Sequence, residues 1–122
     1  MDIDLHRTYV YLTDGADARA VEVDERFWAE IGARAELHDG RLVCQFAMRS
    51  DWDHWEMHPG GDEILVLLSG RLDLVLDAEG GERIVELRAG RTCIVPAGVW
   101  HTARVREPAK GTDPNVFYIR EY

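Results

Sequence analysis

Turn signals recur about every eight to twelve residues along much of this chain, and this rhythm constrains the fold more than any other feature. Each signal joins a glycine to Asp, Gly, Ser, Ala or Pro-Ala, at 14–15, 39–40, 60–61, 69–70, 80–81, 89–90 and 96–98. The intervening segments are rich in Val, Leu, Ile and aromatic residues and predict strands at 8–13, 18–23, 41–49, 54–58, 63–68, 71–76, 83–88, 91–95, 101–106 and 116–121. Short strands at this spacing are typical of an all-β sandwich or barrel.

One segment near the N-terminus predicts a short helix instead. Asp24 is a suitable N-cap, and Phe27, Trp28 and Ile31 form an apolar stripe at helical spacing. We expect this helix to lie on the β structure as a lid, with Phe27 and Trp28 packed against it.

The size and composition predict one soluble globular domain. A chain of 122 residues fits a single core, so we assign residues 1–122 to one domain. The longest apolar stretch, 64–68, is far too short to span a bilayer. Cys44 and Cys93 stand alone in apolar segments without a CxxC pair, which predicts buried small hydrophobic residues rather than reactive thiols.

The charge balance excludes two classes of partner. Acidic residues outnumber basic ones by 23 to 14, giving a net charge of -9, and the basic residues are scattered. Nucleic acids and anionic membranes would therefore be repelled. The N-terminus lacks the basic start and apolar core of a secretory signal, so we expect a cytoplasmic protein.

The strand predicted at 63–68 is apolar on both faces. Glu63, Leu65 and Leu67 can line an interior, whereas the alternate residues 64, 66 and 68 also need cover. A second layer or a second subunit must supply it, and we expect a homodimer.

Polar residues that can face one point flank this strand. In an extended segment His54, Glu56 and His58 share one face, and a buried carboxylate there would need partners. Glu63 follows the Gly60-Gly61 turn directly and so returns beside His58. His54 lies about 13 Å from His58 along a regular strand. We therefore place it at the mouth of the barrel.

A further histidine comes from a distant segment. Pro96 and Gly98 form a tight turn that leads into a strand where His101 shares the apolar face with Ala103 and Val105. His101 is thereby predicted to point inward, which adds a fourth donor to Glu56, His58 and Glu63.

These two segments resemble the paired motifs of the cupins, small β-barrels with motifs G-x5-HxH-x3/4-E-x6-G and G-x5-PxG-x2-H-x3-N. The matching residues are His58, Glu63, Gly70, Gly90, Pro96, Gly98 and His101, within a motif core at 50–105. The sequence departs from the pattern at Ser50, Val105 and Glu56, the last of which replaces the first histidine. The resemblance implies a single jelly-roll β-barrel, a double-stranded β-helix, with a metal site.

The identity of the ligand set stays open at this point. With Glu56 included, the shell has two histidines and two glutamates, which suits Fe or Mn while Zn and Ni remain candidates. Without Glu56, the ligands His58, Glu63 and His101 form a two-histidine, one-carboxylate set suited to oxygen-dependent iron chemistry. A third reading has the acids paired with histidinium groups and no ion.

Cupin-like folds serve many functions, so the resemblance names no reaction. We expect a metal-binding protein that takes a small organic ligand, with His54, Trp100 and Tyr118 as candidate pocket residues and no assigned catalytic residue. A metal-dependent dioxygenase or isomerase is one hypothesis. The alternatives are a non-catalytic binding or sensory module and a cluster that only closes the barrel.

Overall fold

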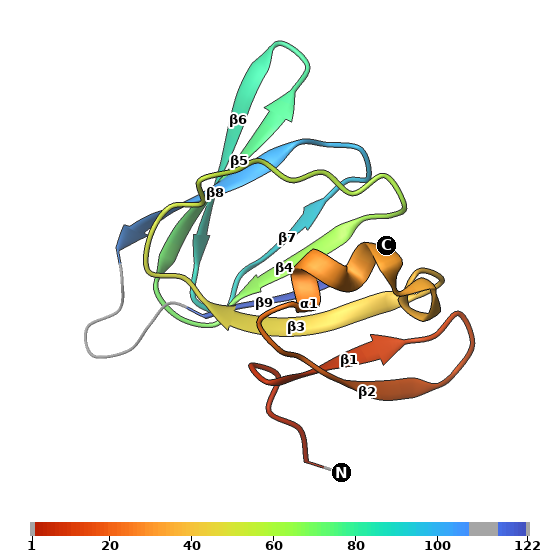
Figure 1. Cartoon of the computed structure of the whole chain (residues 1–122). Helices are drawn as coiled ribbons and strands as arrows, with labels where there is room; N and C mark the ends of the chain where they lie inside the picture. The colour runs from red at the N-terminus through yellow and green to blue at the C-terminus, as the bar shows by residue number, and fades with distance from the viewer. Residues whose placement is uncertain (1, 108–114, 122) are drawn as a thin grey trace.

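The computed structural model describes the backbone of residues 2–107 and 115–121 and the side chains of 2–45 and 47–106. Its elements in chain order are β1 (Thr8–Leu12), β2 (Ala18–Glu22), α1 (Phe27–Glu30), η1 (Ile31–Ala33), η2 (Ala35–Leu37), β3 (Arg41–Ala47), β4 (Glu63–Leu67), β5 (Arg71–Ala78), β6 (Gly81–Arg88), β7 (Thr92–Val95), β8 (His101–Glu107) and β9 (Asn115–Glu121). Within the described residues they form a six-stranded sheet, in the order β2-β1-β3-β9-β4-β7, and a three-stranded sheet, β6-β5-β8. Figure 1 shows this mostly β architecture with its one short helix, which confirms the predicted jelly-roll class.

Nine of the ten predicted strands are present, each with ends within two residues of the prediction. The strand predicted at 54–58 is wrong, because only Glu56 pairs there, in an isolated bridge with His101. The preceding residues follow β8 through scattered bonds instead, such as Trp52 N to the Ala103 carbonyl (2.9 Å). Pro59 has no N–H to donate, so regular strand pairing cannot continue through it.

The helix is shorter than predicted and begins later. Its N-cap is Arg26, so Asp24 is not the cap; the Asp24 carboxylate instead accepts a bond from the Arg26 N–H (2.9 Å) in a turn ahead of the helix. The chain then tightens into 3-10 turns. Phe27 is buried as expected, whereas Trp28 is half-exposed and contacts Tyr9 with its ring.

The core lies between the two sheets and follows the predicted alternation. Leu65 and Leu67 of β4 point inward and are almost fully buried. Cys44 and Cys93 are also buried, which confirms their reading as small hydrophobic residues. No helix in the described part of the chain is long and apolar enough to cross a membrane.

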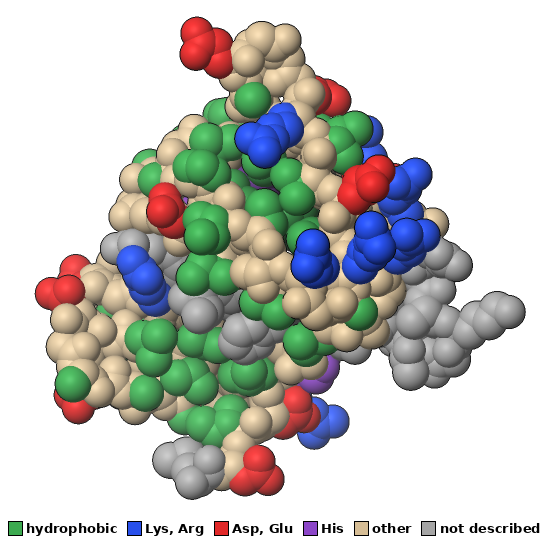
Figure 2. Space-filling view, turned by 180° about the vertical axis from the view of Figure 1, so that it is seen from behind, with side chains coloured by type: hydrophobic (Ala, Val, Ile, Leu, Met, Phe, Trp, Pro, Cys, Tyr) green, Lys and Arg blue, Asp and Glu red, His purple; other side chains and the backbone are tan. Residues whose placement is uncertain are grey.

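The outer face of the six-stranded sheet is also partly apolar. Ile64 of β4 lies opposite Ile94 of β7, which is 61% exposed, and Val66 is the next outward residue on β4. Figure 2 views the molecule from behind and shows hydrophobic side chains spread over much of that surface. The sequence predicted that a second layer or a second subunit covers these positions. Among the described residues, no second layer covers them.

Candidate metal centre

A glycine turn joins the two segments that carry the candidate residues. The Gly98 N–H donates to the His58 carbonyl (3.0 Å), and the Ala97 N–H donates to the Asp62 carboxylate (2.9 Å). Gly98 has a φ of 78°, a left-handed conformation that glycine adopts without steric cost. The turn between β7 and β8 is thereby held against the loop that leads into β4.

The bridge between Glu56 and His101 fixes which way the neighbouring side chains point. The Glu56 N–H donates to the His101 carbonyl (2.8 Å), and the His101 N–H donates to the Glu56 carbonyl (2.9 Å). His101 faces the interior and is fully buried. Since side chains alternate in extended backbone, Trp100 and Trp55 face the outside.

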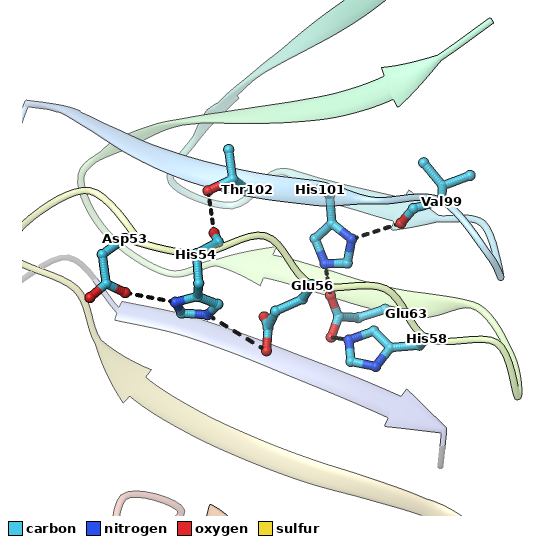
Figure 3. A network of polar contacts seen from close by, with 8 residues as sticks. All are labelled: Asp53, His54, Glu56, His58, Glu63, Val99, His101 and Thr102. Carbon is cyan, nitrogen blue, oxygen red and sulfur yellow. Dashed lines mark hydrogen bonds and ion pairs between the residues drawn. The ribbon is translucent and has the colours of Figure 1, made fainter.

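Glu63 lies between the two histidines (Figure 3). One carboxylate oxygen is 3.0 Å from His101 Nε2, and the other is 3.1 Å from His58 Nε2. Only 1% of the Glu63 side chain and 11% of the His58 side chain are exposed. A carboxylate so deeply buried would be very costly without these contacts.

The orientation and charge of His101 follow from its two hydrogen-bond partners. Its Nδ1–H donates to the Val99 carbonyl (3.0 Å), so Nε2 is turned toward Glu63. Burial of the ring acts to lower the pKa of His101, but the hydrogen bonds to Glu63 and Val99 and the charges of Glu63 and Glu56 outweigh it and raise the pKa. In this arrangement the protonated ring donates from both nitrogens.

Three of the predicted residues bring donor atoms together. Glu56, His58 and His101 each offer one ligand atom, and these atoms lie within 4.8 Å of one another. An ion with bonds of about 2.1 Å spans about 4.2 Å between opposite ligands, so a small inward shift would close the set. Two imidazoles and a carboxylate are donors that suit Zn, Fe, Mn and Ni. The group can therefore hold a divalent transition metal.

Of the other candidate residues, only His54 is seen close to this group. His54 Nε2 is 3.9 Å from the Glu56 carboxylate. Its Nδ1–H donates to the Asp53 carboxylate (2.9 Å), and its ring stacks on Trp52 at 5.2 Å. Trp100 lines a recess, but on the outer face rather than beside the converging donors. Tyr118 belongs to β9, and its side chain lies outside the described residues.

Two supporting contacts were not predicted from the sequence. The Val99 carbonyl orients the His101 ring, and the Asp62 carboxylate anchors the 96–98 turn. A backbone carbonyl leaves no residue-type signal in a sequence. Asp62 had a weak one, because it directly precedes Glu63 in a turn where Asp commonly accepts backbone hydrogen bonds.

Comparisons with known proteins agree with this geometry. The family model described as "Cupin domain" matches residues 42–113, more than half of the chain. A search of the curated proteins found no match.

Solved structures with a similar fold include two cupin proteins and an oxalate oxidase. A cupin-2 domain containing protein from Shewanella frigidimarina is 17% identical, with a TM-score of 0.50 over 68% of this chain and 70% of that one. A cupin superfamily protein from Desulfitobacterium hafniense is 17% identical, with a TM-score of 0.50 over 67% and 65%. An oxalate oxidase is 19% identical, with a TM-score of 0.52 over 66% of this chain and only 40% of its own. At these identities the likeness shows a shared fold.

Proposed function

The chain belongs to the cupin domain family, and on that premise we propose that it is a metal-dependent enzyme acting on a small organic molecule. The observation that carries the proposal is the convergence of donor atoms from Glu56, His58 and His101 within 4.8 Å. Dioxygenase-like or isomerase-like chemistry fits such a site. The cytoplasmic location expected from the sequence stays a prediction.

The proposed ligand set has four members: Glu56, His58, Glu63 and His101. The Glu63 carboxylate contacts the Nε2 atoms of both histidines. An ion placed between the same two rings could therefore be bound by Glu63 in place of these contacts. Its carboxylate and that of Glu56 would together balance the charge of a divalent cation. The Nδ1 bond to Val99 leaves His101 Nε2 as the coordinating nitrogen, as is usual for metal-bound histidines.

The open side of the centre lies toward Glu56. The side chains of Glu63 and His101 are almost fully buried, whereas that of Glu56 is 22% exposed and that of His54 is 53% exposed. A small substrate would enter from this side, and His54 could donate or accept a hydrogen bond there. A bound ion would supply Lewis-acid activation or, for Fe or Mn, redox chemistry at an oxygen-bearing group of the substrate.

The role of Glu56 gives the direct test of this ligand set. We expect Glu56→Ala to weaken metal binding by at least about tenfold to a hundredfold, because losing a ligand costs no less than losing a partner outside the ligand shell. We expect Glu56→His to retain the binding. Elemental analysis of the purified protein and isothermal titration with Mn(II) and Zn(II) would measure this. Asp53→Ala, three residues earlier on the same segment and with a fully exposed side chain, serves as the matched control. Full metal content and affinity in Glu56→Ala would remove Glu56 from the set and leave the three-ligand site.

The reading without an ion makes a different prediction for the same samples. In that case Glu63 simply pairs with the two histidines, and the purified protein would contain no stoichiometric metal and show no saturable titration. A cluster that binds metal only to close the barrel would bind the ion but take no substrate-like ligand.

We also propose a homodimer that uses the outer face of β4 and β7. The apolar pair Ile64 and Ile94 and the 47% exposed Leu68 support it, since monomers rarely leave neighbouring apolar side chains in water. We expect Ile94→Glu to shift the mass measured by light scattering after gel filtration from dimer to monomer. Ile84→Glu, a comparably exposed position on the other sheet, is the control and should leave the mass unchanged. A monomeric wild-type protein would contradict the proposal.

A further inference from the structure

A recess of about 320 Å³ lies on the outside of the three-stranded sheet, on the face opposite to the candidate metal centre. Its lining consists of two tryptophans and two acids: Trp55, Trp100, Asp77 and Glu82. Asp77 of β5 stands directly opposite Glu82 of β6, and the Asp77 N–H donates to the Trp100 carbonyl (2.8 Å). The four side chains thus come from neighbouring positions of adjoining segments.

The two indoles are more exposed than packing alone requires. Trp55 is 39% exposed and Trp100 is 48% exposed, although each is a large apolar side chain. Val75 and Thr102 on the same face are buried, so packing over these two residues explains the buried part of this layer. The remaining indole surface is presented to solvent beside the recess.

The same recess is also lined by two carboxylates, which are charged where the indoles are apolar. Asp77 and Glu82 are exposed, and like charges directly opposite on adjacent strands destabilise a sheet. Among the side chains that the structure describes, neither forms an ion pair with a cation. The recess therefore combines two aromatic side chains with two carboxylates that pair with no cation among the described side chains.

We propose that this recess binds a small alkylammonium ion, at a site separate from the metal centre. The face of an indole attracts an organic cation, and Trp is the best aromatic partner for this interaction. The two carboxylates add Coulombic attraction, and the net charge of -9 favours the approach of cations over anions. Neither a neutral nor an anionic ligand would use both features.

Isothermal titration of the full-length protein with choline chloride would test the site, with 3,3-dimethylbutan-1-ol as the neutral molecule of the same shape. Both molecules carry a hydroxyl, so any contact with a metal ion would be common to them. We expect saturable choline binding with a dissociation constant on the order of 1 mM. The neutral molecule should bind at least about tenfold more weakly. Titration with sodium chloride at equal ionic strength accounts for screening.

Substitutions then locate the binding. The double variant Asp77→Asn, Glu82→Gln should weaken choline binding about tenfold, and Trp100→Leu should weaken it by a similar factor. Both carboxylates are exposed, so the double variant should fold, as circular dichroism would verify. Trp28→Leu, which removes a similarly exposed tryptophan elsewhere, should leave binding unchanged. Equal binding of choline and its neutral counterpart, equal binding to the double variant, or no saturation would each overturn the proposal.

Discussion

His101→Ala is expected to abolish measurable metal binding and to lower the free energy of unfolding by about 3 kcal/mol. The ring is fully buried and lies 3.0 Å from the Glu63 carboxylate, which is itself 1% exposed. Removing the ring therefore leaves a buried carboxylate with one of its two histidine contacts, and breaking such a pair costs far more than breaking a surface one. Urea denaturation of metal-free protein would measure the stability, and titration with Zn(II) would measure the binding.

His54→Ala is the matched control for this variant. It also removes an imidazole near Glu56, but His54 is half-exposed and contacts Glu56 only at 3.9 Å. We expect its unfolding free energy to change by less than about 1 kcal/mol and its metal affinity to change little. If His101→Ala kept its metal, or if the two variants lost stability equally, the assignment of His101 to the centre would be wrong.

Metal affinity is expected to fall by at least about tenfold between about pH 7.5 and about pH 5.5. Only the neutral imidazole can bind an ion, and the contact with Glu63 raises the pKa of His101 despite the opposing effect of burial. A proton therefore competes with the metal already near neutral pH, and each displaced proton costs about tenfold in affinity for every pH unit. Titrations in two buffers of different ionisation enthalpy would count the protons released.

The stability of the metal-free protein should depend on pH in the opposite direction. A raised folded-state pKa means that the folded protein holds the His101 proton more tightly than the unfolded chain does. This contribution to stability is fully present below the unfolded pKa of about 6.5 and is lost as the pH rises through the raised value. Thermal melts of metal-free His101→Ala should lack this component, whereas those of His54→Ala should retain it. Parallel pH dependence in all three proteins would contradict the proposed protonation of His101.

The sequence predicted the fold and most of the positions of the site because both rest on short-range patterns. Alternation along β4 placed Glu63 with the inward leucines, and the spacing of Pro96, Gly98 and His101 predicted a turn that delivers a histidine to the interior. Burial in the structure follows these patterns, since a strand buried on one face must keep its period of two. The turn chemistry likewise depends on a left-handed position that only a glycine fills easily.

Pairing between distant segments was decided by the tertiary structure alone. The Gly60-Gly61 turn predicted that Glu63 lies beside His58, but no local pattern shows that Glu63 also contacts His101. Nor does one show that the chain around Glu56 forms a single bridge with His101 instead of a strand. The contacts with His101 join it to residues about forty positions earlier, and their geometry depends on how the two sheets and the Gly98 turn pack together. For the same reason only the structure shows that Trp55 and Trp100 line the same recess. The sequence by itself determined which chemical groups are available and which way each strand faces; the packing of the strands determined which groups meet.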